Sequence, residues 1–214
     1  MKNNVVPFQL ILHHAGKRFR YEWIFKNINY TFESGVSYAL LGPNGSGKST
    51  LMKILSGHLT PSTGDIQFLN NGKKIIADEM YPFISYSAPY IEVIEEMTLT
   101  EIITFHSKFK PLSIGLKTND IITLLGFKNA ADKEVRFFSS GMKQRLKLAL
   151  SICCQTSILL LDEPTTNLDA QGVAWYRDLM SRFSDKNRLV VVASNIEHDF
   201  DFCAEKLDIL DYKH

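Results

Sequence analysis

The first stretch whose residue types and spacing could do chemistry is a glycine-rich loop that reads GPNGSGKST. Glycines let backbone N–H groups curl around phosphate oxygens, which a Cβ atom would obstruct. Lys48 would bridge the β- and γ-phosphates as a point charge, and Ser49 would place its hydroxyl on Mg²⁺. The loop matches G-x-x-x-x-G-K-[ST], and a strand pattern precedes it while a helical pattern follows. The predicted nucleotide-binding residues of this loop are Gly42, Pro43, Asn44, Gly45, Ser46, Gly47, Lys48, Ser49 and Thr50.

Two adjacent carboxylates form the second candidate for chemistry. Asp162 and Glu163 end an apolar run in the stretch ILLLDEPTTNLD, so both should lie at the carboxyl end of a strand. Ligands bind at that edge of doubly wound sheets. Asp162 is placed to hold Mg²⁺ through water, and Glu163 is placed to polarise an attacking water. The alternative is a strand that simply ends in acidic loop residues, which the phosphate loop disfavours.

A serine- and glycine-containing turn opens a third candidate segment, FFSSGMKQRLKLAL. Taken alone, it predicts an amphipathic helix with Ser139 or Ser140 as its N-cap and Gly141 in the first turn. The free N–H groups of such a helix start could equally face a phosphate.

Short β-rich runs alternate with helical patterns along the chain, which predicts a largely parallel sheet. The helical middle, approximately residues 90–145, should be an insertion in that layout. The expected strands are 8–14, 36–41, 64–69, 83–87, 157–162, 189–193 and 207–210. The expected helices are 50–59, 98–109, 118–127, 142–154, 174–183 and 197–206.

Composition bounds the class of protein. The 214 residues are 45% hydrophobic and 22% charged, with a formal net charge of +1, which gives no electrostatic case for nucleic acid as a partner. The three cysteines form no metal-spaced set and no disulfide framework, so reduced thiols are expected. No apolar run approaches the ~18 residues of a membrane-spanning helix, and no targeting segment is convincing, so we expect a soluble chain.

Together the three stretches resemble the ATP-binding subunit of ABC (ATP-binding cassette) transporters. GPNGSGKST resembles the Walker A motif, ILLLDEP the Walker B, FSSGMKQR the signature usually written LSGGQxQR, and TNLD the D-loop. The resemblance covers nearly the whole chain. It implies one ABC ATP-binding domain over residues 1–214, an α/β P-loop NTPase fold with a mostly parallel sheet core, an N-terminal antiparallel β portion and an inserted helical subdomain.

The resemblance also implies roles for individual residues. Members of the family form head-to-tail dimers that sandwich two ATP molecules, so Ser139 and Gly141 of one protomer would contact the γ-phosphate held by the other. Asp169 would lie at the dimer interface, and Glu163 would be the catalytic carboxylate. Phe19 is the best match for the aromatic residue that stacks on adenine, and Tyr21 is a poorer match. A core aromatic on an early strand is the alternative.

Several positions depart from the family pattern. Ser140 replaces a signature glycine and Met142 replaces a glutamine. The glutamine that usually follows a strand and reaches Mg²⁺ is missing, since Ala88 or Pro89 falls near its place. Metal coordination there would need a water or a neighbour such as Ser87.

The switch histidine is also replaced, because alignment of VVVASN with the family pattern puts Asn195 at its position. His198 lies three residues on and is the weaker candidate for the switch. Ser194 and Glu197 fit a capping box, so the segment could merely start a helix. A neutral amide donates a weaker hydrogen bond than a charged group, and loss of one transition-state donor costs ~10²–10³ in rate.

The resemblance implies a transport-coupled ATPase that converts ATP and water to ADP and phosphate, with ATP and Mg²⁺ as cofactors and slow hydrolysis. Its expected partners are a separate transmembrane permease and a second ATP-binding subunit, identical or different, with no nucleic acid. The chain would lie on the cytoplasmic face of the cell membrane, held there through the permease. The main alternative is a regulatory module that dimerises on ATP without efficient turnover. An ATPase of translation or DNA repair would usually carry two cassettes or a coiled-coil insertion.

Overall fold

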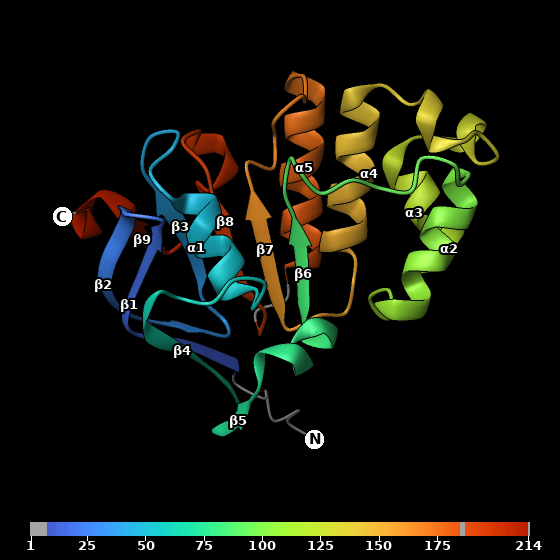
Figure 1. The fold of residues 1–214 in the computed structure, drawn as a ribbon. Helices are drawn as coiled ribbons and strands as arrows, with labels where there is room; N and C mark the ends of the chain where they lie inside the picture. The colour runs from blue at the N-terminus through green and yellow to red at the C-terminus, as the bar shows by residue number, and fades with distance from the viewer. Residues whose placement is uncertain (1–7, 185–186, 214) are drawn as a thin grey trace. The chain divides into compact units, whose positions relative to one another are not determined.

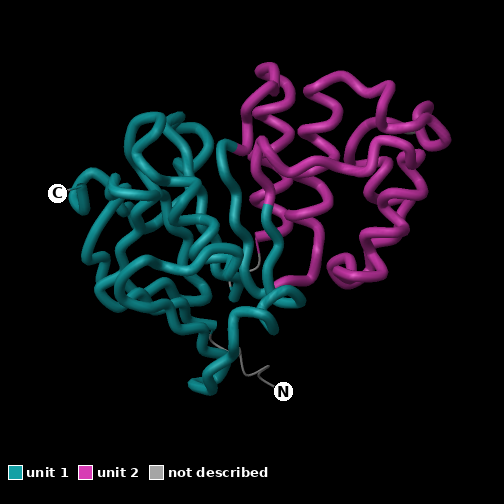
Figure 2. The backbone as a smooth tube through the Cα atoms, viewed as in Figure 1, with its two compact units in different colours: residues 1–86, 157–163, 185–214 teal, residues 87–156, 164–184 magenta. Residues whose placement is uncertain are grey.

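The computed structural model describes residues 8–184 and 187–213, which form two sheets and five α-helices (Figure 1). The chain divides into two compact units (Figure 2). The first unit contains the described residues of 1–86, 157–163 and 185–214, and the second contains 87–156 and 164–184.

An antiparallel sheet occupies the N-terminal part of the first unit. Its strands are β1 (Phe8–Phe19), β2 (Glu22–Glu33), β4 (Thr63–Asn70) and β5 (Lys73–Ile75), in the order β2-β1-β4-β5. Side chains at the start of β1, from Phe8 to Leu12, alternate between buried and half-buried, as expected for a sheet with one face on the core. Asn71 and Gly72 both have positive φ in the turn between β4 and β5, the backbone that a tight hairpin requires.

The second sheet contains β6 (Ile84–Ser87), β7 (Ile158–Asp162), β8 (Leu189–Ala193), β3 (Ser37–Leu41) and β9 (Glu205–Asp208), in that order. Its pairings β7–β8, β8–β3 and β3–β9 are parallel. Every residue of β7 and β8 is buried, which explains their continuous apolar sequences. Helix α1 (Lys48–Leu55) follows β3 and buries Leu51, Ile54 and Leu55 in the core of this unit.

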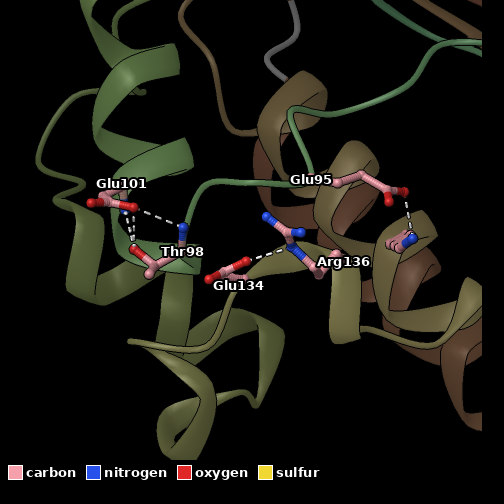
Figure 3. Close-up of polar contacts among 6 residues, drawn as sticks. Glu95, Thr98, Glu101, Glu134 and Arg136 are labelled. Carbon is pink, nitrogen blue, oxygen red and sulfur yellow. Dashed lines mark hydrogen bonds and ion pairs between the residues drawn. The ribbon is translucent and has the colours of Figure 1, made fainter.

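The second unit is built on α2 (Leu99–Phe109), α3 (Thr118–Leu125), α4 (Ser140–Ile152) and α5 (Ala170–Phe183). Thr98 and Glu101 form a capping box at the start of α2, and Figure 3 shows their reciprocal hydrogen bonds. Glu95 accepts a hydrogen bond of 2.5 Å from Lys143 of α4, which holds the segment before α2 against that helix. Single 3₁₀ turns cover 77–79, 81–83, 128–130, 135–137, 197–199 and 209–212.

The predicted fold class, a mostly parallel sheet with an antiparallel portion and helices, is confirmed. The helix expected over 197–206 is wrong, because only Glu197–Asp199 forms a 3₁₀ turn. The chain then enters β9, where Leu207 pairs with Leu40 and is buried, so sheet pairing overrides the helical pattern. The capping box predicted for Ser194 and Glu197 is wrong for the same reason, since there is no α-helix to cap.

No helix among the described residues is long and apolar enough to cross a membrane.

Gly64 provides a test of the antiparallel sheet. Its φ is +69° in β4, and a Cβ atom would overlap the carbonyl oxygens of His13 and His14. Gly64→Ala should therefore lower the free energy of unfolding by about 3–4 kcal/mol, the sum of left-handed strain and overpacking. Gly72→Ala is the matched control, because its φ is +71° and a Cβ would meet open space. The control should cost about 1 kcal/mol in urea unfolding, and equal costs would contradict the model of this strand pair.

His106 on α2 predicts an acid sensitivity of the second unit. Burial, together with the nearby Lys110 charge, lowers its pKa from 6.5 to about 4. The unfolded chain then binds more protons than the folded chain between these pH values, so stability should fall as pH drops from 6.5 to 4. His106→Leu should flatten this part of the pH profile by about 1–3 kcal/mol in denaturant titrations. A variant whose profile matches the wild type would contradict the prediction.

Candidate functional site

The glycine-rich loop lies between β3 and α1 and lines a pocket of about 190 Å³. Gly42, Gly45 and Gly47 all have positive φ, at +133°, +76° and +112°, conformations that side chains with a Cβ rarely adopt. A Cβ on Gly42 would lie 2.7 Å from Ser46 Oγ, and one on Gly47 would lie 2.5 Å from Ile24 Cγ2. All three glycines suit the backbone path, and Gly42 and Gly47 are also needed for close packing.

The Lys48 side chain is buried against the loop itself, with 5% of its surface exposed. Its ammonium donates hydrogen bonds to the carbonyl oxygens of Gly42 at 2.6 Å and Pro43 at 3.2 Å. Burial lowers the pKa of Lys48, while the charges of Glu163, Asp162 and Asp208 act in the opposite sense. The result is a cation held by backbone acceptors at the pocket, suited to an anionic ligand.

Asn195 reaches the same ammonium from the other end of the chain. Its Oδ1 accepts a hydrogen bond of 3.0 Å from Lys48, and its Nδ2 donates one of 2.8 Å to Asn44 Oδ1. A lysine ammonium can only donate, so the carbonyl side of the amide must face it. His198 Nε2 lies 3.7 Å from Asp199 Oδ1, in the 3₁₀ turn that follows. The structure therefore brings Asn195 to the phosphate loop.

Asp162 fits the chemistry of a magnesium ligand. It is 1% exposed, and neither carboxylate oxygen has a hydrogen-bond partner with good geometry among the described residues. Burial raises its pKa; the Ser49 hydroxyl, close by but outside hydrogen-bond geometry, lowers it. Buried carboxylate oxygens beside a hydroxyl form a hard oxygen set that suits Mg²⁺ completed by phosphate. In the described chain no group of three or more His, Cys, Asp or Glu side chains forms a metal site of its own.

Glu163 follows β7 directly and lines the loop pocket. Its φ is +45°, an uncommon backbone conformation for a non-glycine residue that clusters at functional sites. Its backbone N–H donates to Ala193 O at 2.8 Å, which ties this residue to the end of β8. The sheet therefore fixes the backbone position from which Glu163 lines the pocket.

The signature and D-loop residues lie in the second unit. Ser139 is the N-cap of α4 and accepts a hydrogen bond from Met142 N at 3.2 Å. A Cβ on Gly141 would lie 3.1 Å from Asn167 O, so the two segments approach closely. Asp169 caps α5 by accepting from Gly172 N at 2.7 Å. Ser139 and Asp169 therefore each have a structural role as the N-cap of a helix, α4 and α5 respectively.

The segment of Ala88 and Pro89, which the sequence predicts near the position of the family's glutamine, is held to α4. Lys147 donates to Ala88 O at 3.3 Å and to Pro89 O at 3.4 Å. Ser87 Oγ is buried without a hydrogen-bond partner among the described residues.

Two residues near the hairpin of β1 and β2 are relevant to the predicted stacking of an aromatic side chain on adenine. Phe19 ends β1, is 50% exposed, and has the Lys17 ammonium 5.4 Å from its ring centroid. Ile24 lines the loop pocket, a position that sequence reasoning missed. The sequence gives only a weak indication that Ile24 lines a pocket, because an apolar residue in an alternating strand pattern predicts packing in the core.

A family model described as "ABC transporter" matches residues 25–166. The chain belongs to this family. The ABC transporter ATP-binding protein YybJ of Bacillus subtilis is 33% identical over 86% of this chain and 84% of its own length. The lantibiotic transport ATP-binding protein SrtF of Streptococcus pyogenes is 33% identical over 90% of this chain and 84% of its own length.

Solved structures of ABC proteins share the fold. The ATP-binding subunit of an ABC transporter superposes with a TM-score of 0.79 at 21% identity, covering 93% of this chain and 85% of that one. An Atm1-family ABC exporter with ATP bound gives 0.77 at 18% identity, covering 95% of this chain and 37% of that one. The recognition of an ABC ATP-binding subunit from its motifs is confirmed.

Proposed function

We propose that this ABC protein binds and hydrolyses ATP, and that ATP-dependent dimerisation lets it power a membrane transporter. The observation that carries the proposal is the pocket in which Lys48 and Glu163 meet the glycine-rich loop, with the Asp162 carboxylate acting electrostatically on Lys48. Its N–H-rich loop, buried cation and two carboxylates are the parts that phosphoryl transfer requires.

Ser49 and Asp162 would hold Mg²⁺, which supplies charge neutralisation of the phosphates when bound. The backbone of residues 42–50 would bind and orient the phosphates, and Lys48 would exchange its carbonyl partners for phosphate oxygens. Glu163 would orient the attacking water and accept its proton. Phe19 would stack on the adenine ring from the exposed end of β1.

Dimerisation would complete the site. Ser139 and Gly141 of a second protomer would contact the γ-phosphate with the free N–H groups at the start of α4, and Asp169 would lie at that interface. The second protomer is identical or homologous, and a separate transmembrane permease would hold both at the cytoplasmic face of the membrane. The helical segment of approximately 90–145 would act as an inserted subdomain, and the segment from about Tyr86 to Phe109 would dock on the permease.

We propose further that hydrolysis is slow. Asn195 offers a neutral donor at the switch position, and its carbonyl oxygen competes for the Lys48 ammonium. The segment at Ala88 and Pro89 offers no side-chain ligand for the metal, which leaves Ser87 or water for that role. The same observations favour a second candidate, a module that dimerises on ATP without efficient turnover. Phosphate release measured beside ATP-dependent dimerisation distinguishes the two.

Glu163→Gln tests the catalytic assignment. The change keeps the shape of the side chain but removes its basicity, so ATP turnover should fall by at least ~10²-fold. ATP binding, measured by isothermal titration calorimetry, should be retained because the phosphate loop is unchanged. Turnover that survives the substitution would exclude Glu163 as the general base.

Asn195→His tests the origin of slow turnover. An imidazole at this position restores a stronger donor for the γ-phosphate, so kcat at saturating ATP should rise about tenfold or more. Asn195→Ala is the matched control, which removes the amide without adding a donor and should not raise kcat. An unchanged or lower kcat in the histidine variant contradicts the proposal.

A further inference from the structure

Ser194 directly follows β8 and makes three hydrogen bonds. Its backbone N–H donates to Leu40 O at 3.3 Å, and its hydroxyl accepts a hydrogen bond from Ile196 N at 3.0 Å. The same hydroxyl donates to Asp199 Oδ2 at 2.5 Å. The side chain is 1% exposed, so these contacts lie within the protein interior.

Asp199 is an acidic residue that is completely buried, at 0% exposure. Burial of such a group is costly unless its oxygens are hydrogen-bonded, and a short bond from a hydroxyl to a carboxylate is among the stronger kinds. Its backbone N–H also donates to Ile196 O at 3.0 Å. The segment from Ser194 to Asp199 is therefore closed on itself by one bond between side chains, one from a backbone N–H to a side chain and one between backbone groups.

Asn195 lies inside this closed segment. Its side-chain amide makes two hydrogen bonds: Oδ1 accepts from Lys48, and Nδ2 donates to Asn44. An amide NH₂ carries two hydrogens, so one remains to offer to a phosphate oxygen. The direction of that hydrogen depends on the backbone of Asn195, which the neighbouring Ser194–Asp199 bond fixes.

We propose that Asp199 is a positioning residue, acting through Ser194, that aims the Asn195 amide at the terminal phosphate of a nucleoside triphosphate. This inference rests on the proposed function, because it gives Asn195 its γ-phosphate ligand. By this inference Ser194 and Asp199, which lie outside the family motifs, help the protein to bind a nucleoside triphosphate in preference to a diphosphate. Asp199 itself need not touch the nucleotide.

The test compares the Mg²⁺ complexes of ADP and the β,γ-imido analogue of ATP, which is not hydrolysed, by calorimetry. Ser194→Ala removes the hydroxyl with little change of volume and should reduce the preference for the triphosphate about three- to tenfold, the effect of one hydrogen bond. Asp199→Ala should give the same loss. Asp199→Asn, which keeps an acceptor oxygen for the Ser194 hydroxyl, should restore most of the preference.

A double-mutant cycle separates positioning from general structural damage. In an Asn195→Ala background, Ser194→Ala should cause no further loss of preference, because the amide that it aims is gone. An equal loss in both backgrounds would overturn the proposal, and so would an Asp199→Asn variant that behaves like Asp199→Ala.

A measurement without nucleotide tests the positioning step by itself. The side-chain ¹⁵N–H₂ resonances of Asn195 should shift in Ser194→Ala but stay near their wild-type positions in Asp199→Asn. Unshifted resonances in Ser194→Ala overturn the inference. A different result would test the proposed function itself. If the Asn195 resonances shift but Asn195→Ala leaves the triphosphate preference unchanged, Asn195 does not bind the γ-phosphate. The proposal that Asp199 aims Asn195 at that phosphate then fails as well.

Discussion

The burial of the Lys48 ammonium is the constraint on which the site depends. A cation removed from water requires acceptors, and the loop supplies them as the backbone carbonyls of Gly42 and Pro43. The glycines at 42, 45 and 47 have positive φ, which allows the backbone path on which these carbonyls lie. The same backbone path leaves N–H groups for an anion. Asp162 and Glu163 act electrostatically on this cation, so the phosphate loop and the carboxylates form one electrostatic system.

The parallel sheet explains why residues so distant in sequence share that system. Strands β3, β7 and β8 lie side by side, so the phosphate loop, the two carboxylates and Asn195 all follow the carboxyl ends of neighbouring parallel strands. Buried apolar side chains on both faces fix these strands rigidly. Side chains in the loops that follow these strands can therefore differ without a change in the fold.

The sequence predicts well those parts that follow from local patterns. The phosphate loop, the carboxylates after β7 and the N-cap at Ser139 depend on residue type and short spacing, and the structure places them on the expected elements. Contacts between distant segments were not predictable. The bonds from Asn195 to Lys48 and Asn44 join residues 147 and 151 positions apart, and the pairing of β9 with β3 overrode a helical pattern. Asp199 was overlooked because an acidic residue in a polar run predicts exposure, whereas it is fully buried.

The most direct test of this account is calorimetric titration of Mg²⁺–ATP into the wild-type protein and into Lys48→Met, which keeps the length of the side chain but removes its charge. We predict that the wild type binds one ATP per chain and that the variant binds at least ~10-fold more weakly, the loss of more than about 1.4 kcal/mol of binding free energy. Equal affinity in the two proteins would contradict the central claim that the buried ammonium holds the nucleotide phosphates.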